Sequence, residues 1–224
     1  MDKATLKNRI LEIGIVPVVR ASSASQAAMA AEAVAAGGIP IVEITMTVPG
    51  AVDVIRDLAG RSGSGILIGA GTVLDAQSAR RCLDAGAQFL VSPGFDAGTV
   101  AVARDTGVVI MAGALTPTEV ITAWKAGADF VKVFPCANVG GAKYIKALRG
   151  PLPQVPLVPT GGVNLETAAD FLKAGAAALG VGGELVLADA LKANQPRRIT
   201  ELAAQYVEIV QRTRGELAGG VRQQ

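Results

Sequence analysis

Histidine is absent from this sequence of 224 residues. Without an imidazole the chain cannot form a Ser-His-Asp triad, a Cys-His dyad or a histidine-ligated metal site. Only two cysteines are present, Cys82 and Cys136, which excludes a four-cysteine zinc site or iron–sulfur cluster and argues against a disulfide framework. Lacking a histidine partner, both are expected to be small buried hydrophobic residues rather than nucleophiles. Any acid–base catalysis must therefore use Glu, Asp, Lys, Tyr or Cys.

Charged residues are scarce as well, at 18% of the chain, against roughly 25% in an average soluble domain. The formal net charge of +2 produces no basic field, so we expect neither nucleic acid nor a membrane as a partner. No apolar run approaches the ~20 residues of a membrane span, and residues 1–9 contain no apolar signal core. With 50% hydrophobic residues the chain is too apolar to be disordered, and we expect a cytoplasmic protein.

Short apolar runs alternate along the chain with amphipathic, alanine-rich stretches. The runs are rich in Val and Ile, which is typical of buried parallel strands. There are eight of them, at residues 15–19, 39–45, 66–70, 88–91, 108–111, 130–134, 155–158 and 177–181. The stretches between them place apolar residues at helical spacing, over 25–36, 51–59, 75–85, 97–106, 117–126, 141–148 and 165–174. Asp75 and Thr116 suit N-caps, and Pro117 suits a first helical position.

Eight strand–helix units with no break in composition predict an α/β fold, a (β/α)₈ barrel forming one domain over residues 1–213. An open doubly wound sheet is the alternative. Residues 2–12 predict an extra N-terminal helix that closes the bottom of the barrel, and residues 197–213 predict a C-terminal helix. Residues 214–224 are expected to form a flexible tail.

Two charged residues stand inside predicted strands near the C-terminal ends, where barrels place their chemistry. Lys132 lies in the run 130–134, where a dehydrated amine can form a Schiff base with a carbonyl. Alternatively, its ammonium reaches solvent at the strand end. Glu43 lies in the run 39–45, and a buried carboxylate must be paired or functional. It is therefore a candidate general acid–base group, or a structural ion-pair partner of Lys132 or Arg20.

Two glycine pairs follow the last two predicted strands, Gly161-Gly162 and Gly182-Gly183. Barrels often bind phosphate at this place through backbone N–H groups, although glycines also serve simply to make tight turns. Arg20 ends the first strand, where it can grip a carboxylate or phosphate, or remain a solvated loop charge.

Taken together, these strand ends resemble the class I 2-keto-3-deoxy-6-phosphogluconate (KDPG) aldolases, a family that includes the 4-hydroxy-2-oxoglutarate (KHG) aldolases. The resemblance covers about residues 5–195 and rests on six motifs in order: Val42-Glu43-Ile44-Thr45, Ile68-Gly69-Ala70-Gly71-Thr72-Val73, Phe89-Leu90-Val91-Ser92-Pro93-Gly94, Phe130-Val131-Lys132-Val133-Phe134-Pro135, Pro159-Thr160-Gly161-Gly162-Val163-Asn164 and Val181-Gly182-Gly183.

The resemblance implies an aldolase without metal or cofactor, in which Lys132 forms the Schiff base and Glu43 is the acid–base group. It places the keto-acid carboxylate pocket at Arg20, Thr72 and Pro93, and Phe134 on the lining of the site. It places the phosphate site beside Thr160, at Gly161, Gly162, Gly182 and Gly183. The implied partners are small molecules, a 2-keto acid and a phosphorylated aldehyde, and the implied assembly is a homotrimer.

Two positions differ from the pattern of many family members. Gly183 stands where many have a serine and is followed by Glu184, which removes one hydroxyl donor and adds a nearby negative charge. The loop after Glu43 reads Met46-Thr47-Val48, where some members have an arginine and others a threonine.

The implied reaction is cleavage of KDPG to pyruvate and glyceraldehyde 3-phosphate, with cleavage of KHG to pyruvate and glyoxylate as a possible second activity. Three alternatives stay open at this point. One is an aldolase for 2-keto-3-deoxy-6-phosphogalactonate. The others are a phosphosugar isomerase or epimerase that uses Glu43 as a base, and a non-catalytic barrel that binds a small ligand.

Overall fold

Eight parallel strands form the centre of the molecule in a computed structural model that describes residues 1–61 and 65–221. They are β1 (Ile15–Val19), β2 (Ile41–Thr45), β3 (Leu67–Gly71), β4 (Phe89–Val91), β5 (Val109–Ala114), β6 (Phe130–Val133), β7 (Leu157–Pro159) and β8 (Leu179–Val181). Every residue in them is buried, as expected for strands covered on both faces. All eight overlap the predicted apolar runs.

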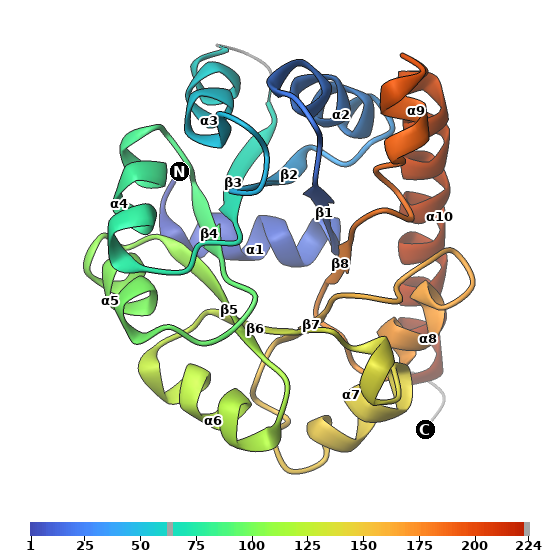
Figure 1. The fold of residues 1–224 in the computed structure, drawn as a ribbon. Coiled ribbons are helices and arrows are strands. Elements are labelled where there is room, and N and C mark those ends of the chain that lie inside the picture. Colours follow the sequence, from blue (N-terminus) through green and yellow to red (C-terminus); the bar gives the residue numbers. More distant parts are fainter. Residues whose placement is uncertain (62–64, 222–224) are drawn as a thin grey trace.

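The sheet runs in the order β7-β6-β5-β4-β3-β2-β1-β8, and its two end strands meet. Thr160 and Gly180 form a parallel bridge between them, and the N–H of Ala177 donates to the carbonyl of Leu157 over 2.8 Å. The end strands of an open sheet do not touch, so this contact confirms the (β/α)₈ barrel and excludes the doubly wound alternative. Figure 1 looks into the resulting ring.

The helices surround the strands (Figure 1). In chain order they are α1 (Lys3–Ile13), α2 (Ala24–Ala36), α3 (Ala51–Gly60), α4 (Ala76–Asp84), α5 (Ala97–Asp105), α6 (Pro117–Ala126), the 3-10 helix η1 (Ala137–Val139), α7 (Ala142–Arg149), α8 (Ala168–Lys173), α9 (Ala188–Lys192) and α10 (Pro196–Val221). Within the described residues no helix combines the length and apolar character needed to cross a membrane.

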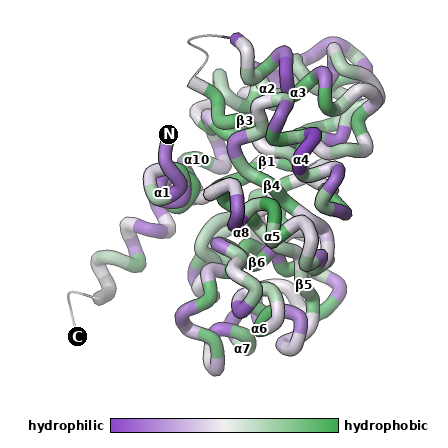
Figure 2. The backbone as a smooth tube through the Cα atoms, turned by 90° about the vertical axis from the view of Figure 1, so that its left-hand side faces the viewer, coloured by the Kyte–Doolittle hydropathy of each residue, from purple (hydrophilic) through white to green (hydrophobic). Residues whose placement is uncertain are grey.

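Helix α1 is the predicted extra helix, and it lies across one end of the barrel (Figure 2). Its Leu6 and Ile10 are buried. Lys3 Nζ lies 2.9 Å from Asp129 Oδ2 just before β6, and the same carboxylate accepts the N–H of Ile110 in β5. These contacts fix α1 against the N-terminal ends of the strands, which leaves the opposite end free for a site.

The predicted helix caps are confirmed at two helices. Asp75 accepts a hydrogen bond from the N–H of Ser78 at the start of α4. Thr116 and Glu119 form a reciprocal capping box at the start of α6, whose first residue is Pro117. Both use side-chain oxygens to satisfy N–H groups that lack partners within the helix.

The chain after residue 213 differs from the expected tail, because α10 continues as a helix to Val221. Arg214 donates to the carbonyls of Glu12 and Ala177 over 2.8 and 3.2 Å, and Glu216 pairs with Lys173 at 3.2 Å. These tertiary contacts support turns that local sequence alone leaves weak around Gly215. The last three residues of the expected tail, 222–224, lie outside the described residues. Helix α9 was not predicted, since five residues are too few to show a helical period.

Candidate active site

The centre of the barrel mouth holds a buried pair of opposite charges. Lys132 in β6 places its Nζ 3.5 Å from Oε1 of Glu43 in β2, with side chains only 5% and 2% exposed. Three strands separate β6 from β2 in the sheet order, so the two side chains meet across the barrel interior rather than along its wall. Both residues were predicted from the sequence as candidate site residues. Their contact is the ion pair with Lys132 that was one of the predicted roles of Glu43.

Glycines on the strands next to β2 and β6 permit close packing around this pair, of the Glu43 carboxylate at Gly71 and of the loop after β4 at Gly113. Gly71 in β3 lies so close to Glu43 that a Cβ there would collide with the carboxylate oxygen Oε1. Gly113 in β5 is the register partner of Lys132, and a Cβ there would collide with the backbone of Pro93 and Gly94. The role of Gly71 was not predicted from the sequence. Its signal was the glycine spacing in Gly69-Ala70-Gly71, which repeats with the period of a strand.

Glu43 has unused hydrogen-bonding capacity. Its Oε1 is buried and has no hydrogen-bond partner among the described residues. The 3.5 Å to Lys132 Nζ exceeds the roughly 2.7–2.9 Å of a charge-assisted hydrogen bond. A buried carboxylate oxygen without a partner is unfavourable in the resting protein. It can therefore accept a proton or hydrogen bond from a hydroxyl that enters the site.

Beside this pair lies a cavity of about 170 Å³. Its lining contains every residue assigned to the phosphate site, together with Arg20, Phe134, Val163, Gly180 and Glu184. Phe134 connects the two parts of the site, because Lys132 Nζ lies 5.8 Å from the centre of its ring. The structure thus brings both glycine pairs to one place next to the lysine.

Backbone conformation shapes the floor of this cavity. Gly161 and Gly162 have φ values of +88° and +79°, in the left-handed region that favours glycine. A Cβ on Gly180 would collide with Oγ1 of Thr160, and that buried hydroxyl has no hydrogen-bond partner among the described residues. The cavity therefore presents glycine backbone without side-chain cover, beside a buried hydroxyl that has no partner among the described residues.

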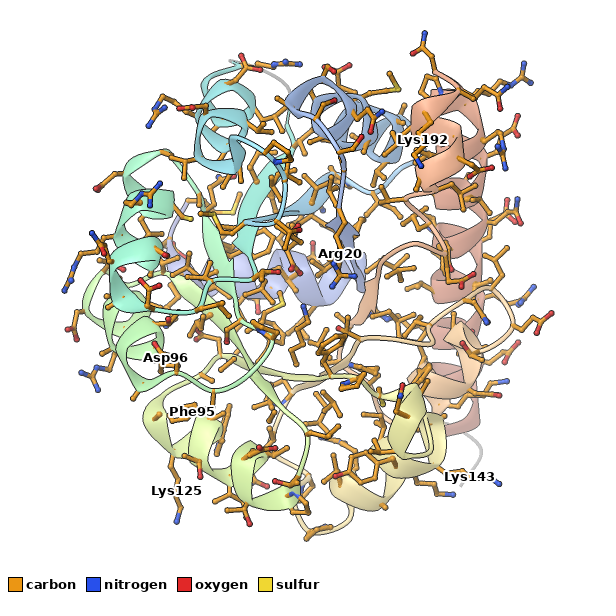
Figure 3. The ribbon with its side chains drawn as sticks, in the orientation of Figure 1. Arg20, Phe95, Asp96, Lys125, Lys143 and Lys192 are labelled. Carbon is orange, nitrogen blue, oxygen red and sulfur yellow. The ribbon has the colours of Figure 1, made fainter. Side chains whose placement is uncertain are left out.

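Arg20 supplies the positive charge of the cavity. Its side chain lies at the middle of the barrel mouth (Figure 3), and its Nη1 would be 3.6 Å from a Cβ on Gly182. Among the described residues no carboxylate forms an ion pair with it. A cation beside exposed backbone is suited to an anion, for which a guanidinium can provide two parallel hydrogen bonds.

Thr72 and Pro93 lie outside that cavity lining. Thr72 follows Gly71 directly, and its φ of +56° is unusual for a residue with a side chain. Pro93 follows β4 and packs its backbone against Gly113. Both therefore belong to the strand ends nearest Glu43 and Lys132, whereas Arg20 lies with the glycine loops.

The two cysteines are buried and not bonded to each other. Burial raises the pKa of the Cys82 and Cys136 thiols to about 11. Both thiols therefore remain protonated near neutral pH, and protonated thiols are poor nucleophiles. This confirms their prediction as buried residues and leaves Lys132 as the candidate nucleophile of the barrel mouth.

Comparison with known proteins finds a matching family and a similar bacterial protein. Residues 6–202 match the family model of the KDPG and KHG aldolases. The KHG/KDPG aldolase of Escherichia coli (strain K12) is 37% identical over 206 residues, which cover 91% of this chain and 96% of that protein.

Two solved structures are similar in fold over most of the chain. The KDPG aldolase from Legionella pneumophila, with pyruvate captured as a covalent carbinolamine intermediate, has a TM-score of 0.82 and 30% identity, covering 88% of this chain and 96% of that one. A cube-shaped protein cage designed by fusing symmetric oligomeric domains has a TM-score of 0.85 and 28% identity, covering 94% of this chain and 76% of that one.

Proposed function

This chain belongs to the KDPG and KHG aldolase family, and on that premise we propose that Lys132 and Glu43 carry out its Schiff-base cleavage of KDPG. The protein is a carbon–carbon lyase of class I. The observation that supports this assignment of roles is the buried contact of 3.5 Å between Lys132 Nζ and Glu43 Oε1. It places one amine and one carboxyl where barrels perform their chemistry.

The first step is formation of the imine. The neutral amine of Lys132 attacks the C2 ketone of KDPG, and loss of water from the carbinolamine gives a protonated imine. Glu43 is close enough to take the proton that the lysine ammonium must lose before it attacks, and to return that proton to the carbinolamine hydroxyl, which leaves as water. Closure of the barrel bottom by α1 and the burial of both groups keep bulk water away from the reacting atoms.

The second step breaks the C3–C4 bond. Glu43 removes the proton of the C4 hydroxyl, directly or through a water, and the electrons of the C3–C4 bond move into the imine. Glyceraldehyde 3-phosphate leaves with the new C4 carbonyl, and an enamine remains on Lys132. Protonation at C3 and hydrolysis then release pyruvate and regenerate the amine. Glu43 Oε1 has no hydrogen-bond partner among the described residues, so it is available for this exchange of protons.

The two ends of the substrate would occupy different parts of the site. Thr72 and Pro93, beside the charged pair, would hold the keto-acid carboxylate. The cavity of Thr160, Arg20 and the glycine pairs would hold the phosphate. Its place at the ends of β7 and β8 is where barrels commonly bind that group. This geometry favours a phosphate contact for Arg20 over the carboxylate contact that the family resemblance implied.

Pyruvate release tests the function and the phosphate site together. We expect kcat/KM for KDPG to exceed the values for 2-keto-3-deoxygluconate, which lacks the phosphate, and for KHG. Gly183→Ser should raise only the KDPG value, by roughly one hydrogen bond or two- to tenfold, since a Cβ there meets nothing within 4 Å. Equal kcat/KM values for KDPG and 2-keto-3-deoxygluconate would contradict the assignment of this cavity as the phosphate site. Absence of pyruvate would contradict the proposed function itself.

We further propose that the protein works as a cytoplasmic homotrimer. The similar designed cage was built from symmetric oligomeric domains, and both cysteines are free thiols, as is usual in a reducing compartment. Light scattering of the purified protein should give three times the mass of 22.7 kDa, and a monomer mass would contradict the assembly.

A further inference from the structure

Glu184 lines two cavities at once. One is the proposed phosphate cavity, which it shares with Arg20. The other, of about 390 Å³, lies behind the same loop and is lined as well by Asn164, Leu165, Glu166, Leu187, Leu202 and Tyr206. The exposed side chain of Glu184 therefore stands at the boundary between the two.

The second cavity holds an unsatisfied hydrogen-bond donor. Tyr206 of α10 is fully buried, and its hydroxyl has no partner among the described residues. Desolvation raises the pKa of this phenol, and the negative charge of Glu184 raises it further. The hydroxyl therefore keeps its proton at neutral pH. A buried hydroxyl without a partner costs free energy, which a hydrogen bond to a carboxylate would recover.

The phosphate cavity gives Glu184 a reason to move. A phosphate and a carboxylate in one small cavity repel each other, and both compete for the guanidinium of Arg20. Glu166 is the other carboxylate that lines the Tyr206 cavity, but it is not on the lining of the phosphate cavity. Glu184 is also the charged group whose field acts on the Tyr206 phenol.

We propose that Tyr206 makes the enzyme selective for its phosphorylated substrate by donating a hydrogen bond to Glu184 and holding that carboxylate out of the phosphate cavity. The inference rests on the proposed function, because it requires the substrate phosphate to bind beside Arg20. Tyr206 is then a positioning residue that acts through Glu184 and does not touch the substrate. The hydrogen bond from Tyr206 would explain how this cavity can bind a phosphate dianion although Glu184 lies on its lining.

Kinetics of four variants test this coupling. Tyr206→Phe should lower kcat/KM for KDPG by about tenfold, the size of a hydrogen bond to a charged group, and leave the value for 2-keto-3-deoxygluconate unchanged. Glu184→Gln should raise kcat/KM for KDPG, because the repelling charge is gone. In the double variant Tyr206→Phe should have little further effect, since no charge remains to be held away. Glu166→Gln is the matched control and should behave as wild type.

Thermal unfolding with inorganic phosphate gives a second readout. If Tyr206 served only to pack the core, its substitution would not change the rise in Tm that phosphate causes. Tyr206→Phe removes a hydroxyl that has no partner, so Tm without phosphate should be unchanged or higher. The rise in Tm that phosphate causes should be smaller than in wild type.

Besides a Tyr206→Phe variant that is indistinguishable from wild type, two results would overturn the inference. One is an equal loss for both substrates in Tyr206→Phe, and the other is the same loss with Glu184→Gln present. Failure of the proposed function looks different, since wild type itself would then show no preference for KDPG and no rise in Tm with phosphate. A wild type that prefers KDPG, with Tyr206→Phe indistinguishable from it, overturns the Tyr206 role alone.

Discussion

At the scale of single residues, the contact between Lys132 and Glu43 depends on the absence of a side chain at Gly71. Gly71 leaves the space that the Glu43 carboxylate fills, and a Cβ there would collide with Oε1. The sequence alone could identify Lys132 and Glu43, because each is a charge inside an apolar run. It could not show that Gly71 faces Glu43, since that depends on the packing of β2 against β3. The cavity that Tyr206 shares with Glu184 was equally hidden, because it depends on the packing of α10.

Gly71→Ala should disable catalysis while the barrel stays folded. The added methyl group displaces Glu43, and displacement of a catalytic group by about 1 Å costs roughly 10² in rate. Overpacking should lower stability by about 1–3 kcal/mol. Steady-state pyruvate release and urea unfolding measure the two effects. Gly60→Ala is the control, because a Cβ there meets nothing within 4 Å. Normal kcat in Gly71→Ala would mean that Glu43 needs no fixed position.

Glu43→Gln should lower kcat by roughly 10²–10⁴, the usual contribution of one acid–base group. The amide keeps the shape of the carboxyl but cannot carry its proton, so pyruvate binding should remain largely intact. Pyruvate release under saturating KDPG measures the loss. Glu119→Gln, the same chemical change on an exposed helix cap, should leave kcat unaltered. An unchanged rate in Glu43→Gln would reduce Glu43 to a structural partner of Lys132.

At the scale of elements, the strands were the most predictable part of the chain. A buried strand is a short apolar run, and each of the eight runs overlaps its observed strand. The end of α10 was not predictable, because the contacts of Arg214 and Glu216 with α1, with α8 and with Ala177 just before β8 join segments far apart in the sequence. The pairing of the two glycine loops likewise depends on closure of the ring between β7 and β8.

The cap of α6 predicts a dependence of stability on pH. Hydrogen bonds from the N–H groups of Thr116 and Leu115 hold the pKa of Glu119 below its ordinary value of 4.5. A lowered pKa means that this carboxylate stabilises the folded state above the ordinary value. That stabilisation is lost as pH falls through the lower, folded value.

Glu119→Gln should therefore cost about 0.5 kcal/mol at pH 6, a small value because the site is exposed. The difference from wild type should shrink below pH 4.5 and vanish in stronger acid. Urea unfolding at several pH values measures it. Glu208→Gln, an exposed carboxylate in the middle of α10, serves as the control. A difference that grows as pH falls would contradict the cap.

At the scale of the whole molecule, the barrel assembles its site from strands that are distant in sequence. Lys132 comes from β6, Glu43 from β2, and the proposed phosphate cavity from the ends of β1, β6, β7 and β8. The α/β class and the eight strands follow from composition and periodicity, whereas closure into a barrel is established by the contact between β7 and β8. The division of the site into the Lys132–Glu43 pair and a neighbouring cavity depends on three-dimensional packing. The same packing brings Arg20 to the two glycine pairs.

Activity should survive removal of metal ions. The described residues contain no group of three or more His, Cys, Asp or Glu side chains placed to hold a metal, and the proposed steps need only an amine and a carboxyl. Dialysis against EDTA should leave kcat and KM for KDPG unchanged. Loss of activity with recovery on adding Mg²⁺ or Mn²⁺ would indicate a metal-dependent aldolase instead.

Chemical trapping of the imine tests the role of Lys132 as the Schiff-base residue. Incubation with pyruvate and sodium borohydride should inactivate the enzyme irreversibly. Mass spectrometry of the digested protein should find one carboxyethyl group on the peptide that contains Lys132. Lys132→Arg keeps the positive charge but cannot form an imine, so it should be neither labelled nor active. Label on a different lysine, or full cleavage activity in Lys132→Arg, would contradict the assignment of Lys132 as the Schiff-base residue.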